Sequence, residues 1–181
     1  MKKPVLIFLW IFLCLNILVG QDNNTSDSIL WREGYNLTWA DFKGEVIDLP
    51  NYCGECFCMN LANFKRANIL LPFYCQVASA FDRTKSWVNP ECQNDQLLLY
   101  FQVMFNIYEL HARKLRKDFS EIKFGKDPTP VFNEKYNASM TALTSYLNNY
   151  RVETKMGTDI DNLKKSDAKV KEELNELSEF K

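Results

Sequence analysis

The chain has 181 residues, and 22 Lys and Arg offset 23 Asp and Glu to give a formal net charge of −1. No basic stripe interleaved with aromatic residues is present, so we expect no nucleic-acid partner. The length suffices for one domain with a hydrophobic core.

The first 20 residues form the pattern of a secretion signal. Two lysines precede an apolar run over residues 5–19, and Gly20 supplies a small residue at the expected cleavage point. We therefore predict a signal peptide over residues 1–20 and an exported protein, periplasmic or extracellular, with no membrane span after cleavage. The alternative is an uncleaved anchor, but the run is shorter than the ~20 apolar residues that cross a bilayer.

Export makes the cysteines candidates for disulfides. The part after the signal contains an odd number of them, so one thiol is left over or pairs with another chain. The candidates are Cys53, Cys56, Cys58, Cys75 and Cys92.

The next segments predict a leader and a small sheet. Residues 21–28 are polar and predict a flexible leader. Residues 29–43 predict a short strand and then a tight turn closed by Gly44. Residues 55–89 are rich in strand formers, and Pro72 within them favours an edge or the start of a strand.

Three helices are expected in the rest of the chain. Residues 96–119, capped by Asn94 or Asp95, are apolar almost all round in the first half, which is typical of a helix buried between layers. Residues 132–150 and 159–180 predict two more helices. The fold class is therefore α+β, with a small antiparallel sheet packed on a long central helix and two further helices. The narrow apolar stripe of the last helix is a candidate docking surface, and a partly frayed, solvent-facing helix is the alternative.

Residues 97–117 resemble the central helix of a family of secreted bacterial zinc peptidases. In that family the helix carries His-Glu-x-x-His and, further on, an Ala-Arg-Lys-Leu-Arg run, and residues 112–116 match this run. Here Tyr100 and Met104 stand at the two His positions, and Phe101 stands at the Glu position. The resemblance thus keeps the scaffold and loses the metal-binding chemistry.

Three other blocks extend this resemblance. Residues 37–44 are similar to the family's Leu-Thr-Trp-x-Asp-Phe-Lys-Gly signature, and residues 81–88 to its strand pair before the metal helix. Residues 150–157 resemble its closing Tyr-x-x-Glu-Thr-x-His-Gly, with Met156 at the histidine position. The resemblance implies a zincin-like, degenerate peptidase-like domain over residues 29–157, followed by a charged C-terminal helix over residues 158–181.

The replaced residues decide the expected function. Two histidines four residues apart on a helix can hold one zinc ion, with the intervening Glu as general base. Tyr100 and Met104 are not a zinc ligand pair, and Phe101 cannot accept a proton. We therefore expect no catalytic residue, metal or cofactor, and an exported binding or scaffolding protein of the cell envelope or exterior, whose partner is an unknown protein or envelope component. One alternative is an active hydrolase with unusual metal ligands. Another is that the residues at these positions were always part of the hydrophobic core and the resemblance is over-interpreted.

Two features of the central helix receive ordinary interpretations. His111, the only histidine, is expected to be a packed or rim residue rather than a metal ligand. Glu109 and Arg113, four residues apart, are expected to form a surface ion pair worth ~0.2–0.5 kcal/mol.

The cysteine cluster at residues 53–58 leaves three interpretations open. Disulfides are favoured by export. Structural zinc would need a fourth ligand from Cys75 or Cys92, and a thiol–disulfide protein would use Cys53, Cys56 and Cys58. Alternation along a strand places Cys56 and Cys58 on the same side, and we expect each to find a partner elsewhere.

Overall fold

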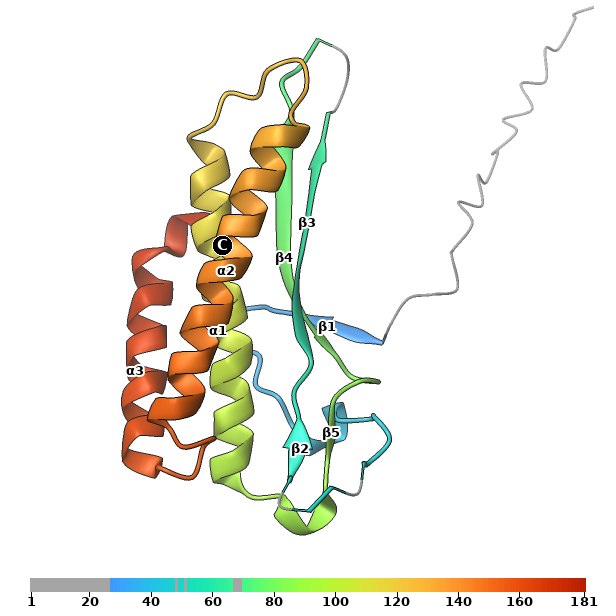
Figure 1. The fold of residues 1–181 in the computed structure, drawn as a ribbon, viewed down its shortest axis with the longest axis vertical. Coiled ribbons are helices and arrows are strands. Elements are labelled where there is room, and N and C mark those ends of the chain that lie inside the picture. Colours follow the sequence, from blue (N-terminus) through green and yellow to red (C-terminus); the bar gives the residue numbers. More distant parts are fainter. Residues whose placement is uncertain (1–26, 48, 51, 67–69) are drawn as a thin grey trace, which may run out of the picture.

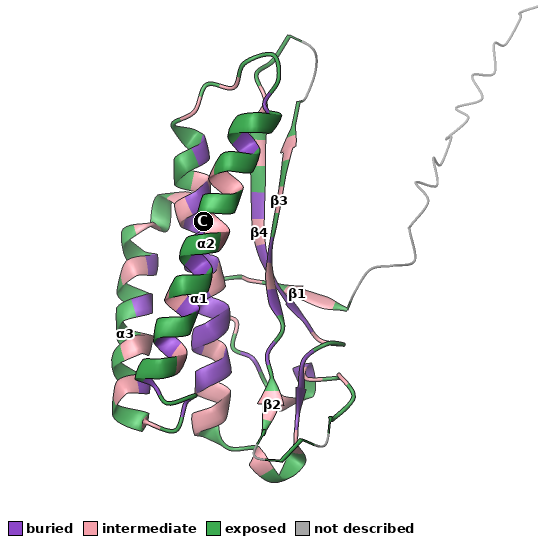
Figure 2. Cartoon of the chain, in the orientation of Figure 1, coloured by how far each residue is buried: buried purple, intermediate pink, exposed green. Residues whose placement is uncertain are grey.

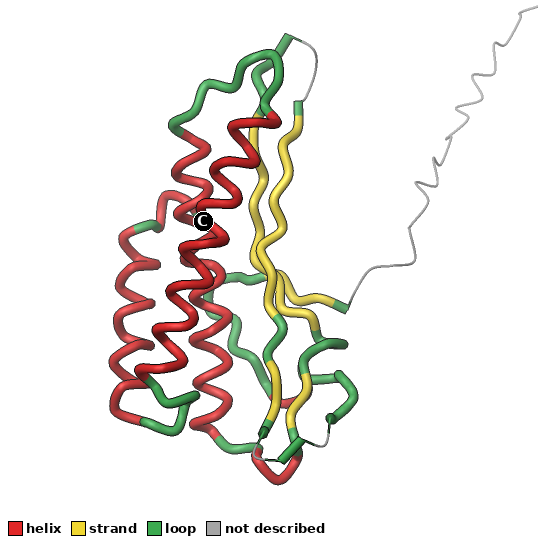
Figure 3. Tube along the Cα trace, in the orientation of Figure 1, coloured by secondary structure: helices red, strands yellow, loops and turns green. Residues whose placement is uncertain are grey.

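The computed structural model describes residues 27–47, 49–50, 52–66 and 70–181, so the predicted signal peptide and nearly all of the predicted leader lie outside the described residues. The fold is α+β: three helices pack beside two small antiparallel sheets (Figures 1 and 3). Within the described residues no helix is both long and apolar enough to cross a membrane.

The larger sheet has the strand order β1-β4-β3. It is formed by β1 (Ser28–Leu30), β3 (Cys58–Lys65) and β4 (Tyr74–Asp82). In the antiparallel register Cys58 lies opposite Phe81, and Phe64 lies opposite Cys75. The smaller sheet pairs β2 (Gly54–Glu55) with β5 (Trp87–Val88). The β structure predicted for residues 55–89 is confirmed, and β4 begins just after Pro72.

The strand expected within residues 29–43 is largely absent. Apart from the end of β1, this segment contains a 3₁₀-helix at Trp39–Asp41. The carboxylate of Asp41 accepts hydrogen bonds from the backbone N–H of Thr38, at 2.8 Å, and from its hydroxyl, at 2.9 Å. This capping box stabilises a helical turn where the aromatic residues alone favoured extended chain.

The three predicted helices are confirmed, with somewhat different ends. They are α1 (Asp95–Ser120), α2 (Thr129–Glu153) and α3 (Ile160–Glu176). Asn94 caps α1 by accepting a hydrogen bond from the N–H of Leu97 at 2.9 Å. The predicted last helix is interrupted at Leu177, and a 3₁₀-helix follows at Ser178–Phe180.

The first helix forms the centre of the fold. It contacts β3 and β4 and also α2 and α3, so its sequence is apolar almost all round where it is enclosed. Figure 2 shows burial concentrated along α1, whereas α2 is largely exposed on its outer face.

The apolar stripe of α3 is not a docking surface, because the fold itself covers it. Leu163, Val170 and Leu174 are buried and pack in the same core cluster as α1. The Arg113 guanidinium also donates a hydrogen bond to the carbonyl of Leu174 at 2.6 Å. The expectation that this stripe is a docking surface is therefore wrong. The helix does face solvent on its other sides, but it is regular from Ile160 to Glu176.

Glu109 and Arg113 are not a surface pair either, since each side chain is only 2 % exposed. The Glu109 carboxylate accepts hydrogen bonds from Arg113 Nε at 3.1 Å and from Arg116 Nη1 at 2.9 Å. Arg116 in turn donates to the carbonyls of Val77, at 3.0 Å, and Phe180, at 2.6 Å. This buried network joins α1 to β4 and to the C-terminal end of the chain.

Candidate functional site

The four positions singled out by the resemblance come together at one cavity. Tyr100, Phe101 and Met104 lie on the first turns of α1, and Met156 lies just beyond the end of α2. The hydroxyl of Tyr100 is 3.8 Å from the sulfur of Met156. Residues 56 positions apart in sequence are thus in contact, and all four line the same cavity.

The aromatic residues at this site are fixed by neighbouring rings. Tyr100 stacks on Tyr150 of α2, with ring centroids 5.2 Å apart, and the Tyr150 hydroxyl donates to the Tyr100 carbonyl at 2.9 Å. Phe101 packs on Phe42 at 5.3 Å. Tyr100 and Phe101 are both buried, so they form a rigid wall rather than mobile side chains.

A left-handed turn places Met156 at the cavity. Lys155, Met156 and Gly157 have φ values of 49°, 56° and 86°. A Cβ atom at Gly157 would lie 2.7 Å from the ring of Tyr100, so glycine is required there for space as well as for conformation. The Gln96 amide donates to the carbonyls of Gly157, at 2.8 Å, and Thr158, at 3.1 Å, which fastens the turn to α1.

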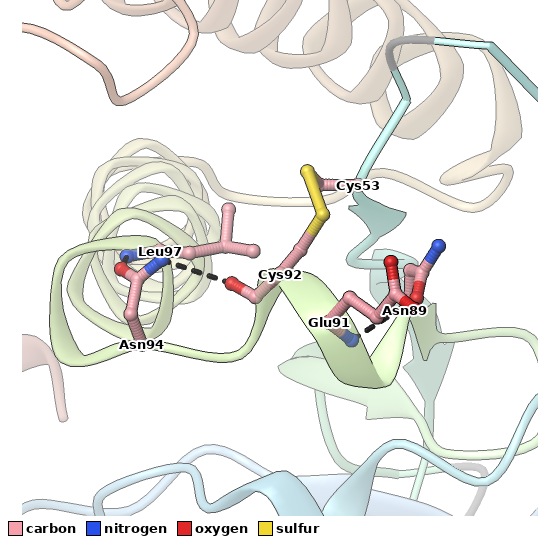
Figure 4. Close-up of a disulfide and its surroundings, with 6 residues drawn as sticks. All are labelled: Cys53, Asn89, Glu91, Cys92, Asn94 and Leu97. Atoms are coloured by element: carbon pink, nitrogen blue, oxygen red, sulfur yellow. Dashed lines mark hydrogen bonds between the residues drawn. A yellow bond between two sulfur atoms is a disulfide. The ribbon is translucent and has the colours of Figure 1, made fainter.

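A disulfide closes another side of the cavity. Cys53, just before β2, is bonded to Cys92 at the end of the turn that leads into α1 (Figure 4). The expectation of a disulfide is therefore confirmed for this pair. Because Cys53 directly precedes β2 and Cys92 lies just before α1, the bond ties β2 to the start of α1. Both cysteines line the cavity.

The cavity has a volume of about 500 Å³. Its walls come from the segment around β2, the start of α1 and the turn after α2. Its lining is mainly apolar, with a few polar groups, which is the usual character of a small-ligand site. The residues are Tyr52, Cys53, Gly54, Glu55, Cys56, Cys92, Asn94, Gln96, Leu97, Tyr100, Phe101, Met104, Arg151, Met156, Gly157 and Thr158.

Two charged side chains, Arg151 and Glu55, also line the cavity. Among the described residues, Arg151 forms no ion pair with a carboxylate. Its guanidinium lies 3.5 Å from the Asn148 side chain and also interacts with the Tyr100 hydroxyl. Burial raises the pKa of Tyr100, and the nearby positive charge of Arg151 opposes that rise. Arg151 and Glu55 therefore place one positive and one negative charge at a mainly apolar cavity, without a direct ion pair between them. The sequence signal was weak: Arg151 falls inside the block 150–157 but has no role in its motif.

The side chains at the four positions do not fit zinc. Tyr100, Phe101, Met104 and Met156 supply neither imidazole nor carboxylate, the donors that zinc uses in a hydrolytic site. Across the residues that the structure describes, no group of three or more His, Cys, Asp or Glu side chains is placed to hold a metal ion. No chemical step through a metal can be derived from this arrangement.

The only histidine lies elsewhere on α1. His111 is 4 % exposed and packs edge-on against Tyr146, with ring centroids 5.5 Å apart. Its Nε2 has no hydrogen-bond partner. Burial, followed by the charge of Lys114, lowers its pKa to about 4. The expectation of a packed histidine is confirmed.

The other three cysteines that the structure describes are not bonded to one another. Cys56 and Cys58 are buried, with their sulfur atoms 3.5 Å apart, and Cys75 is partly exposed on β4. The two neighbouring cysteines lie on the same side, as predicted, but neither is bonded to a more distant cysteine.

Comparison of the chain with protein-family models, with curated proteins and with solved structures gives no match. The resemblance to secreted zinc peptidases therefore rests on the four sequence blocks described above.

Proposed function

We propose that this chain is an exported, non-catalytic relative of a zinc peptidase that binds a ligand in the cavity beside Tyr100 and Met156. The observation that carries the proposal is the convergence of Tyr100, Phe101, Met104 and Met156, from two separate sequence blocks, on one cavity. A peptidase site that had lost its zinc ligands to apolar residues would have this arrangement. The disulfide between Cys53 and Cys92 is compatible with export.

The charge at the cavity indicates the kind of ligand. An apolar group would contact Leu97, Met104 and Met156, and an acidic group beside it would meet Arg151. Charge-assisted hydrogen bonds from a guanidinium to an acidic oxygen are stronger than neutral ones and fix orientation. The ligand is thus a protein segment or envelope component that presents an apolar group next to an acidic one.

Binding can be tested with an anilinonaphthalene sulfonate dye, which combines aromatic rings with a negative charge. We expect residues 21–181, exported to an oxidising compartment, to enhance the fluorescence of this dye. Met156→Glu should weaken binding about tenfold, because it removes an apolar contact and places a negative charge beside an anionic dye. Val152→Glu is the matched control, since Val152 is 77 % exposed and does not line the cavity.

Two further variants test the charge. Arg151→Ala should weaken dye binding, whereas Glu55→Gln should leave it unchanged or strengthen it, because it removes a negative charge from the same cavity. Equal binding by all four variants, or no binding by the parent protein, would show that the cavity is not the binding site.

The degenerate-site interpretation has its own test. Tyr100→His, Phe101→Glu, Met104→His and Met156→His together should create a zinc site, measured as bound zinc per folded chain. A folded variant that binds no zinc would contradict the alignment of these positions, and the three histidine substitutions without Phe101→Glu provide a milder version. Stoichiometric zinc in the parent protein, together with chelator-sensitive peptide hydrolysis, would favour the alternative of an active hydrolase.

A further inference from the structure

Two buried thiols face each other between β2 and β3. Cys56 and Cys58 are each 6 % exposed, and their sulfur atoms are 3.5 Å apart. Cys56 Sγ also lies 3.8 Å from the carbonyl of Phe101 on α1. The pair therefore lies between the sheet and the central helix, with Cys56 at the wall of the cavity.

The backbone between these thiols is held in place. Phe57 donates its N–H to the hydroxyl of Ser86 at 2.9 Å, and its carbonyl accepts from the N–H of Asp82 at 2.9 Å. Phe57 itself points outward, 37 % exposed, with the Lys85 ammonium 4.7 Å from the centre of its ring. With the middle residue fixed outward, the two flanking cysteines are kept on the inner side.

Among the described cysteines, none other is placed to form a disulfide with Cys56 or Cys58. Cys53 is already bonded to Cys92. Cys58 lies opposite Phe81 on β4, and Cys75 is six residues before Phe81 on the same strand, a separation of roughly 20 Å. The described residues also bring no third metal-ligating side chain of the His, Cys, Asp or Glu type to the pair.

We propose that Cys56 and Cys58 are joined by a second disulfide in the exported protein. This inference shares only the exported compartment with the proposed function and does not depend on ligand binding. One thiolate attacks a small-molecule disulfide such as oxidised glutathione and releases one thiol. The second cysteine then attacks the mixed disulfide and releases the other thiol. In total one sulfur–sulfur bond forms, one breaks, and two protons and two electrons pass to the oxidant.

Burial makes Cys58 the less reactive thiol. Desolvation, strengthened by the neighbouring Cys56, raises the pKa of Cys58 well above its ordinary value. Because the thiolate is the attacking species, and because Cys56 lines the cavity, we expect Cys56 to attack the oxidant first.

Peptide mapping tests the proposal directly. Residues 21–181 would be exported to an oxidising compartment, unfolded without reductant, alkylated, and digested with trypsin. The sequence places Cys53, Cys56 and Cys58 in the peptide 44–65, Cys75 in 67–83 and Cys92 in 86–113. We expect peptide 44–65 linked to 86–113 with no alkylated cysteine and a mass four hydrogen atoms below that of the two reduced peptides, two for each disulfide, and one alkylation on 67–83.

Substitutions make the mapping specific. Cys75→Ser should abolish all alkylation, whereas Cys58→Ser should add one alkylated site at Cys56. Alkylation of both Cys56 and Cys58 in the parent protein would overturn the proposal, and so would a bond from either of them to Cys75 or Cys92.

Discussion

The buried carboxylate of Glu109 makes the sharpest prediction about stability. Glu109→Gln keeps the size of the side chain but removes the charge that faces Arg113 and Arg116. Arg113 is 2 % exposed, so water cannot replace the lost partner. Breaking a buried pair from one side typically costs about 3–5 kcal/mol, and we expect Glu109→Gln to lower the free energy of unfolding by about 3 kcal/mol.

The matched control is another i,i+4 pair on α3. Lys171 donates to Asp167 at 2.7 Å, and the lysine side chain is 61 % exposed. Lys171→Ala should cost less than about 1 kcal/mol, as exposed pairs generally do. Urea unfolding at neutral pH measures both variants, and equal slopes with urea would show that only stability has changed.

A double-mutant cycle separates the pair from the rest of the network. Arg113 also donates to the carbonyl of Leu174 and lies over the Trp31 ring, with 5.0 Å to its centroid, so Arg113→Met removes more than the ion pair. Glu109→Leu combined with Arg113→Met should cost less than the sum of the single changes, because the double variant leaves neither Glu109 nor Arg113 as an unpaired buried charge. Arg116 also loses its carboxylate in the double variant, but its side chain is 20 % exposed. A cost for Glu109→Gln below about 1 kcal/mol, equal to that of the control, would refute the buried-network reasoning.

Four other outcomes are expected. The pKa of His111 is about 4 in the folded state and 6.5 for the free side chain, so its contribution to stability is complete above pH 6.5 and falls by up to about 3 kcal/mol as the pH drops toward 4. The free energy of unfolding, measured at several pH values, should fall less over this range in His111→Phe. An equal fall in both proteins would contradict the prediction. Gly157→Ala should destabilise by about 1–3 kcal/mol, because the positive φ and the contact with Tyr100 both oppose a Cβ atom; no change in melting temperature would argue against the close contact. Cys92→Ser opens a bridge that spans 39 residues and should cost about 4 kcal/mol on the chain-entropy model, checked by urea unfolding, and a negligible cost would imply that the bond does not form. A chelator should leave the melting temperature unchanged, and a lowered value would reveal a structural metal.

The sequence predicted the elements of the fold better than their environment. Alternation, apolar runs and helix caps are local signals, so the strands after residue 55 and the three helices were predicted close to their observed positions. Burial of Glu109 is not local. It depends on Arg116 and on the distant carbonyls of Val77 and Phe180, so an ordinary i,i+4 spacing could not reveal it.

The candidate site shows the same division. The sequence blocks identified Tyr100, Phe101, Met104 and Met156, and the structure gathers them at one cavity. Arg151 carried no distinguishing signal, because its importance comes from the absence of a carboxylate partner among the described residues and from a cavity that only the folded chain forms.

The arrangement of α1 explains how a cavity could keep its shape without a metal. Its first turns, which line the cavity, are tied to their surroundings by the Cys53–Cys92 bond and by the Gln96 hydrogen bonds to the turn after α2. Its later turns are tied to β4 and to the C-terminal end through Glu109 and Arg116. Since Tyr100, Phe101, Met104 and Met156 supply none of these ties through their side chains, we expect substitutions at these four positions to change the cavity lining while the ties still hold α1 in place.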